Sequence, residues 1–169
     1  LYPYRTATLK GCRMTVESVR SFLETHAPDI AIVELQASTA TVEMAARGHG
    51  VEPAQIAKTL SLRIRDRTLL IVTAGDARLN NRKIKDVLGG KPRMLSADEI
   101  VAATGHPVGG VCPFGLPAPL PIYCDVSLKA FAEVVPAAGS TNAALRIAPQ
   151  RMAELVGAEW IDVCDRPTP

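Results

Sequence analysis

The chain has 169 residues, a length that fits one domain with its own hydrophobic core. Hydrophobic residues make up 47% of it and charged residues 21%, proportions that are typical of a globular protein and exclude a disordered or fibrous chain. The formal net charge of +2 does not identify a nucleic-acid-binding protein by itself, so any basic surface has to be local.

The four cysteines, at positions 12, 112, 124 and 164, lie far apart and show no paired spacing. This pattern favours reduced thiols and predicts neither a metal site nor a disulfide framework. No apolar run approaches the roughly 18 residues that span a bilayer, and the N-terminus lacks the apolar core of a signal peptide. We therefore expect a cytoplasmic protein without metal, cofactor or membrane partner. Residues 1–13 have no clear periodicity and are expected to be a leader or appended segment before a domain over 14–165.

Helical and extended patterns alternate in the first part of the domain. The predicted elements are a helix capped by Thr15 that ends near Pro28, a strand over 30–35, and a second helix capped by Ser38 or Thr39 that runs to Gly48 or Gly50. The inner face of this second helix is expected to carry Val42, Ala45 and Ala46.

One lysine lies in register with the apolar face of the next segment. Over residues 56–65, a period of two puts Leu60, Leu62 and Ile64 on one side of a strand, together with Lys58. Burying an unpaired ammonium is costly, so an inward Lys58 should lie at the strand end, beside a polar cavity and an anionic or carbonyl partner. The other interpretation is a strand that begins after Lys58, whose side chain then reaches solvent.

A second strand and a basic helix follow. Residues 68–73 are apolar on both faces, which predicts a central strand paired as a hairpin with the first one. Residues 74–76 make a turn, and Asn80 or Asn81 caps a helix through Leu88. The helix and its flanks hold the one basic concentration of the chain, which consists of Arg78, Arg82, Lys83, Lys85, Lys91 and Arg93. It is either an ordinary solvated helix face or a surface for phosphates.

A loop rich in proline and glycine comes after a short helix. Ser96 and Glu99 form a capping box for this helix, which ends at Gly105. Residues 106–121 contain five prolines and three glycines, so no regular helix can run through them. Such a loop exposes backbone amides that can hold a carbonyl oxygen or a phosphate, although the same residues also mark plain connectors.

The remaining chain alternates short strands with short helices. Strands are predicted over 122–125, 134–137, 144–147 and 160–163, with helices from Ser127 to about Glu133 and from Pro149 to Gly157. No glycine fingerprint follows the first strand, so a dinucleotide-binding fold is not indicated. The whole pattern predicts a single compact domain of mixed α/β, or α+β, class.

Four motifs together resemble a known family. They are Ala57-Lys-Thr-Leu60, Ala74-Gly-Asp-Ala-Arg-Leu79 with Lys83, Gly109-Gly-Val-Cys-Pro-Phe-Gly115, and Gly139-Ser140. In this order and spacing, from about Met14 to Asp162, the chain resembles the YbaK/ProX (YbaK/EbsC) aminoacyl-tRNA deacylases, relatives of the editing domain of bacterial prolyl-tRNA synthetases. The resemblance implies a mixed, partly barrel-like sheet surrounded by short helices. It also implies hydrolysis, without a metal, of the ester between a mischarged amino acid and the 3′ end of tRNA.

The resemblance also implies the residues of the site. Lys58 matches the lysine most needed for activity, and is expected to hold a phosphate or polarise the ester carbonyl rather than act as a base. The amides near Gly109 and Gly110 are expected to stabilise the developing oxyanion. The expected substrate-binding residues are Thr59, Asp76, Cys112, Pro113, Phe114, Gly115, Gly139 and Ser140, and the expected tRNA contacts are Arg78, Arg82, Lys83 and Lys85. Thr141-Asn142 stands where family members have an arginine or histidine, so the amino acid removed stays open.

Two other interpretations remain open. The same cavity and basic residues suit a non-catalytic module that holds charged tRNA or a synthetase such as prolyl-tRNA synthetase. A cysteine hydrolase centred on Cys112 is the third, although a packed loop residue is the simpler interpretation because no histidine follows it at a suggestive spacing. His106 is expected at the loop entry rather than as a base, and Asp76 chiefly as a turn residue.

Overall fold

The computed structural model describes the backbone of residues 4–165 and the side chains of residues 15–165. The helices are α1 (Tyr4–His26), α2 (Val42–His49), α3 (Asn81–Leu88), α4 (Ala97–Thr104) and α5 (Pro149–Val156), with 3₁₀ helices η1 (Pro53–Gln55) and η2 (Val126–Ala130). The strands are β1 (Val33–Glu34), β2 (Ile56–Ile64), β3 (Arg67–Ala74), β4 (Arg78–Leu79), β5 (Pro92–Met94), β6 (Ile122–Asp125), β7 (Val135–Pro136), β8 (Ala143–Ala144), β9 (Glu159–Ile161) and β10 (Cys164–Asp165).

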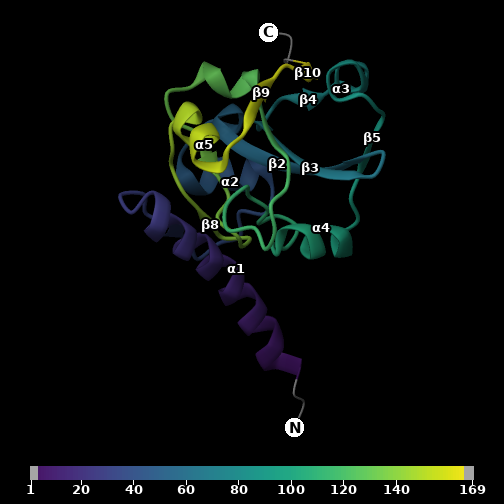
Figure 1. Ribbon diagram of the computed structural model, residues 1–169. Coiled ribbons are helices and arrows are strands. Elements are labelled where there is room, and N and C mark those ends of the chain that lie inside the picture. The colour runs from purple at the N-terminus through teal and green to yellow at the C-terminus, as the bar shows by residue number, and fades with distance from the viewer. Residues whose placement is uncertain (1–3, 166–169) are drawn as a thin grey trace.

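A six-stranded mixed sheet organises the molecule (Figure 1). Its strand order is β5-β2-β3-β6-β9, and β7 also pairs with β2. β2 and β3 form the predicted antiparallel hairpin, in which Lys58 stands opposite Thr73. β6 joins β3 in parallel and β9 joins β6 in parallel. The predicted mixed α/β domain is therefore confirmed, and its sheet is open rather than a closed barrel.

The sheet separates two apolar cores. On one face, Leu70 and Val72 pack with Val19 and Leu23 of α1 and with Met152 of α5. On the other face a second cluster gathers residues of β2, β3 and α3, namely Leu62, Ile64, Leu69, Ile71 and Ile84. Because Lys58 is in register with Leu62 and Ile64, it belongs to the face of the second cluster.

The first helix is longer than the sequence predicts. α1 begins at Tyr4, so Thr15 lies inside it and does not cap it. The Thr15 hydroxyl instead donates a hydrogen bond to the carbonyl of Gly139, a partner 124 residues away. Figure 1 shows the N-terminal half of α1 extending away from the body of the molecule. Residues 1–3 of the expected leader lie outside the described residues.

Several boundaries differ from the prediction where tertiary contacts choose the partner. The strand expected over 30–35 pairs only at Val33 and Glu34, with β8. α2 is capped by Thr41, whose hydroxyl accepts from the amide of Met44, whereas Thr39 donates to the carbonyl of Thr141. The helix expected from residue 127 is the 3₁₀ helix η2.

The caps of α3 and α4 are confirmed. Asn80 accepts hydrogen bonds from the amides of Arg82 and Lys83, and Ser96 with Glu99 forms the complete capping box. In the described part of the chain, no helix combines the length and the apolar character that crossing a bilayer requires.

Candidate functional site

Lys58 is half-buried and its ammonium is held by the backbone. Nζ donates to the carbonyl of Ala77 at 2.6 Å and to that of Gly75 at 3.0 Å. The partner expected for an inward lysine is therefore a pair of carbonyls in the turn that follows β3. An ammonium has three donors, so one N–H remains for a substrate oxygen. Burial lowers the pKa of Lys58 below its usual value, against a smaller opposing effect of the Asp76 carboxylate.

The turn that holds Lys58 requires glycine. A Cβ on Gly75 would lie 2.0 Å from the carbonyl oxygen of Pro53 and 2.8 Å from Val42 of α2. Close packing of η1 and α2 against this turn thus sets where the Gly75 carbonyl points. Asp76, between the two carbonyls that accept from Lys58, is exposed at the turn. The adjoining β4 pairs with β10, which ties the turn to the C-terminal part of the fold.

A cavity of about 250 Å³ opens along β2 beside Lys58. Its walls are mostly apolar and come from segments far apart in sequence: the N-terminal end of α2, residues 56–61 of β2, the loop before Cys112, and the β7–β8 region. Three expected site residues, Lys58, Thr59 and Gly109, line it. Its volume lies below the range of roughly 300–1,000 Å³ that is common for ligand pockets, so it fits an aminoacyl group better than a whole nucleotide.

The glycine loop contributes less to this wall than its sequence implies. Gly109 has φ +87° and packs against Ala40, so a Cβ there would lie 2.9 Å from that of Ala40. Gly110 uses its amide to donate to the carbonyl of Pro107 at 2.9 Å. Its own carbonyl accepts from the amide of Gly139 at 3.0 Å. The amide of Gly110 is thus engaged within the protein.

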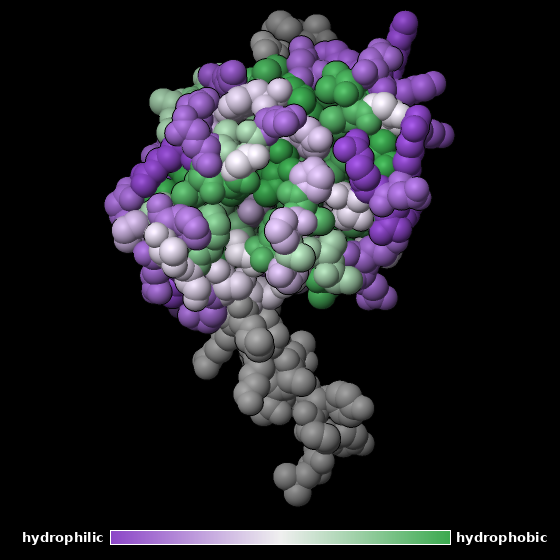
Figure 2. Space-filling view, in the orientation of Figure 1, coloured by the Kyte–Doolittle hydropathy of each residue, from purple (hydrophilic) through white to green (hydrophobic). Residues whose placement is uncertain are grey.

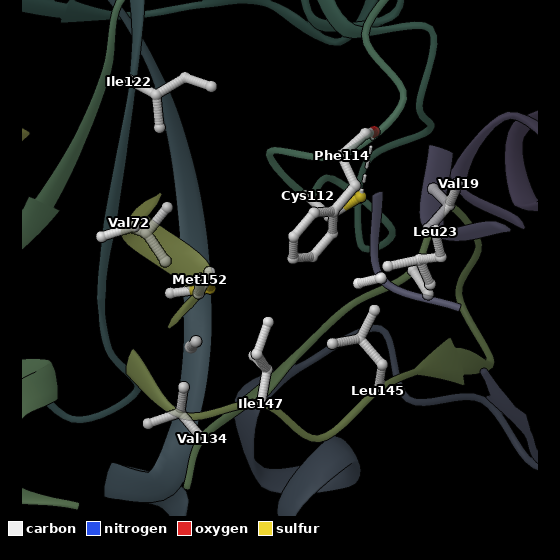
Figure 3. Packing of buried hydrophobic residues seen from close by; sticks show 14 of the residues in the cluster. Val19, Leu23, Val72, Cys112, Phe114, Ile122, Val134, Leu145, Ile147 and Met152 are labelled. Atoms are coloured by element: carbon white, nitrogen blue, oxygen red, sulfur yellow. Dashed lines mark hydrogen bonds between the residues drawn. The ribbon is translucent and has the colours of Figure 1, made fainter. Parts of the chain in front are cut away.

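Cys112 and Phe114 lie in the apolar core, as Figure 3 shows. Both are fully buried, and the wall of the cavity, drawn from the described residues, includes neither. Burial raises the pKa of the Cys112 thiol to about 12. Buried His106 lies 3.4 Å from this thiol and donates from Nε2 to the Phe114 carbonyl at 2.8 Å. The sequence did not predict this contact between a histidine and a cysteine that lie six residues apart in the loop.

The other expected substrate-binding residues make contacts within the protein and do not line the cavity. Gly115 has φ +64° and packs against the backbone of α1 at Ser18, and Gly139 packs against Thr15. Ser140 donates to the side chain of Asn142 at 2.7 Å and is buried. Together with Pro113, these residues are outside the wall of the cavity in the part of the chain that the structure describes.

The expected tRNA contacts divide into two kinds. Arg78, Arg82 and Lys85 are exposed. Lys83 donates to the carboxylate of Asp162 at 3.0 Å and to the carbonyl of Cys164 at 2.9 Å. Figure 2 shows hydrophilic side chains along the edge of the molecule that carries α3 and the β2–β3 turn.

Most of the cavity wall has no signal in the sequence. Val42 and Ala45 were predicted on the inner face of α2, and in the structure both line the cavity. The other unpredicted wall residues reach the cavity through tertiary folding alone, and include Met94, Ile100, Val108, Val111, Ala143 and Ala144. Among residues 15–165, no group of three or more His, Cys, Asp or Glu side chains is placed to hold a metal ion.

Comparison with known proteins identifies a family model, related sequences and a solved structure that match this chain. Residues 36–155 match the model of the aminoacyl-tRNA editing domain. The uncharacterized protein YwhH of Bacillus subtilis (strain 168) is 45% identical over 153 residues, covering 89% of this chain and 98% of YwhH. Proline–tRNA ligase of Bacillus licheniformis is 31% identical over 106 residues, which cover 62% of this chain and 18% of the ligase. The solved structure of a candidate trans-editing enzyme for prolyl tRNA synthetase matches with a TM-score of 0.84 at 34% identity, over 90% of this chain and 98% of that one.

Proposed function

Because the chain belongs to the aminoacyl-tRNA editing domain family, we propose that it hydrolyses the ester that joins a mischarged small amino acid to the 3′ end of a tRNA. The observation that carries this proposal is the Lys58 ammonium, held by two backbone carbonyls in the wall of a cavity of about 250 Å³. Such a fixed charge can act on a developing oxyanion without reorganising during the reaction.

In this mechanism Lys58 positions the ester and a water molecule attacks it. Its third N–H polarises the ester carbonyl or holds a phosphate oxygen at the 3′ end. Burial lowers the pKa of Lys58, but its ammonium already donates to the carbonyls of Gly75 and Ala77, so we assign it an electrostatic role rather than that of a general base. The reaction uses no metal or cofactor in this proposal.

The proposed substrate implies that the protein binds tRNA and acts with the enzyme that charges it. Arg78, Arg82 and Lys85 are exposed and suit contacts with tRNA phosphates. Similarity to proline–tRNA ligase and to a candidate trans-editing enzyme supports a tRNA charged in error by prolyl-tRNA synthetase, with that synthetase as the proposed protein partner. The cytoplasm is the proposed place of action.

The proposal is tested with a panel of tRNAs that carry labelled alanine, cysteine, serine or threonine. We expect wild-type protein to cleave one or two of these esters with multiple turnovers. Lys58→Met should lower the rate by 100-fold or more, as expected for loss of a preorganised charge. Lys129→Met is the matched control, because Lys129 is exposed and its Nζ lies over Trp160, outside the cavity. Full activity of Lys58→Met would contradict the proposal, and tight tRNA binding without turnover would indicate a non-catalytic module.

A cysteine hydrolase predicts a different result. Cys112→Ser should retain the wild-type kcat, because the thiol is buried in the core and its pKa is raised to about 12. A serine hydroxyl can still donate to the Phe114 carbonyl, which accepts from the thiol at 3.7 Å. The same panel and a thermal melt measure activity and fold, and a loss of kcat in a folded variant would favour the cysteine mechanism.

A further inference from the structure

The edge of β2 is interrupted at the cavity. On this edge β7 pairs with Ile56 and Ala57, and β5 pairs from Leu62 to Ile64. On the opposite edge, β3 pairs without a break from Ala57 to Ile64. Within residues 4–165, no strand covers residues 58–60 on the interrupted edge. The cavity occupies this gap, because its wall includes residues 58–60 together with residues of β7 and β5.

One residue in the gap directs its backbone into the cavity. In an antiparallel ladder, successive residues turn their N–H and C=O groups alternately to the two edges. The amide of Leu95 donates to the carbonyl of Ser61 at 3.1 Å, which shows that Ser61 faces the interrupted edge. Thr59, two residues earlier, has the same orientation, whereas the N–H and C=O of Lys58 and Leu60 turn to the edge that β3 occupies. The N–H and C=O of Thr59 therefore both point into the cavity.

An aminoacyl ester presents the complementary pair of groups. Its α-ammonium is a donor and its carbonyl oxygen is an acceptor, and both belong to one residue. In a hydrogen-bonded antiparallel pair, two residues exchange two such bonds. We infer that the aminoacyl group docks on β2 as a one-residue antiparallel strand: its α-ammonium donates to the Thr59 carbonyl, and the Thr59 amide donates to the ester carbonyl. This inference rests on the proposed function and deepens it.

The pairing supplies a donor for catalysis. Water attack forms a new C–O bond and moves the carbonyl electrons to oxygen, which the Thr59 amide stabilises. Collapse of this intermediate breaks the ester C–O bond, and a proton from the attacking water ends on the 3′-oxygen of the ribose. The amide of Gly110, which already donates to Pro107, is not needed for this step.

The pairing also fixes the direction of the amino-acid side chain. Directly opposed residues of an antiparallel pair place their side chains on the same face of the sheet. The side chain of an L-amino acid then lies beside that of Thr59, whose Oγ1 is buried without a hydrogen-bond partner in the described structure. A D-amino acid would place its side chain on the face of Lys58 and Leu60 instead. We therefore expect preference for L-aminoacyl esters with a free amino group.

The first test compares a cleaved aminoacyl-tRNA with its analogue that lacks the α-amino group, such as alanyl-tRNA against propionyl-tRNA. Each enzymatic rate is divided by the spontaneous rate of the same ester, because the ammonium itself activates the bond. We expect the enhancement to be at least 10-fold smaller for the propionyl ester. Equal enhancement for both esters would overturn the inference and leave the proposed hydrolysis intact.

The second test removes the donor from the protein. Replacing Thr59 by its α-hydroxy acid changes one backbone amide to an ester and keeps the side chain. We expect kcat to fall by 10-fold to 1,000-fold, the loss typical of one oxyanion donor. The matched control is the same replacement at Thr68, whose amide faces the other edge of the hairpin and which lies outside the cavity wall. An unchanged kcat at position 59, or an equal loss at both positions, would overturn the inference.

A binding measurement separates this inference from the proposed activity. The probe is adenosine carrying alanine through a 3′-amide, which cannot be cleaved as an ester. Hydrogen exchange of the Thr59 amide should slow at least 10-fold when the probe binds, while exchange at Thr68 should stay unchanged. If exchange slows but no aminoacyl-tRNA is cleaved, the docking mode stands and the proposed hydrolysis fails. If the probe binds without slowing exchange at Thr59, the docking mode is wrong.

Discussion

At the scale of single residues, the candidate site depends on how tightly the turn after β3 is packed. Lys58 has no carboxylate partner among its described hydrogen bonds and relies on the carbonyls of Gly75 and Ala77. The two carbonyl groups hold the ammonium in place only as long as their peptide units keep their orientation. The glycine at position 75 thus has an effect on the lysine although its own side chain is a hydrogen atom.

Gly75→Ala should weaken both fold and activity. Its Cβ would meet the Pro53 carbonyl oxygen at 2.0 Å, so the turn must move, which we expect to cost about 1–3 kcal/mol of the free energy of unfolding. The displaced carbonyls would also misplace Lys58, and deacylation per folded molecule should fall. Urea unfolding and single-turnover rates measure the two effects. Gly50→Ala is the control, since it has φ +67° but open space around it. It should lose about 1–2 kcal/mol without loss of activity per folded molecule.

At the scale of elements, the loop before β6 is stabilised by buried polar contacts. His106 is fully buried, and its Nε2 donates to the Phe114 carbonyl. Burial lowers the pKa of His106, against a smaller opposing effect of that carbonyl. The histidine is therefore neutral in the folded protein over a pH range in which the unfolded chain, with a pKa near 6.5, already binds a proton.

Stability should therefore fall as pH falls below about 6.5. The stabilising contribution is complete above the unfolded pKa and is lost towards the lower folded pKa, with a slope of at most about 1.4 kcal/mol per pH unit for one group. His106→Gln keeps a donor for the Phe114 carbonyl but does not titrate, so its stability should depend less on pH. Urea unfolding between pH 5 and 8 compares the two proteins, and His49, whose pKa burial also lowers, is common to both. Parallel pH profiles would contradict this account.

Short-range sequence patterns predicted which elements form better than they predicted which elements lie side by side. The β2–β3 hairpin, the Asn80 cap and the Ser96–Glu99 capping box depend on short-range patterns and are confirmed. The gap along β2 could not be predicted, because it depends on where β5 and β7 stop pairing, and these strands have only three and two residues. The glycine loop showed the same limit. Its composition indicated free amides, but the use of the Gly110 amide by Pro107 is a property of the folded turn.

At the scale of the whole molecule, the small net charge means that the proposed binding of tRNA would depend on few contacts. Each neutralised phosphate contributes to the dependence of binding on salt, with a slope of about 0.7–0.9 in log–log units. Exposed Arg82 is free to make such a contact, whereas Lys83 bonds to Asp162 and to the Cys164 carbonyl. Adjacent cations in α3 should therefore have different roles.

Arg82→Ser should weaken tRNA binding and lower the salt slope by somewhat less than one unit. Lys83→Met should leave the slope unchanged and lower the melting temperature, because it releases β10 from α3. Filter binding over a series of salt concentrations, with thermal melts of both variants, distinguishes the two roles. The assignment fails if Lys83→Met changes the slope and Arg82→Ser does not.

The pairing of β4 with β10 also bears on the order in which the molecule is made. The turn that holds Lys58 continues into β4, and β4 pairs with Cys164 and Asp165, more than one hundred residues after the lysine. On a ribosome, β2, β3 and the turn emerge long before that last strand. A nascent chain can thus carry the lysine and most of the cavity while the turn still lacks its partner. We expect hydrolytic competence to appear late in synthesis, once residues 164–165 have docked.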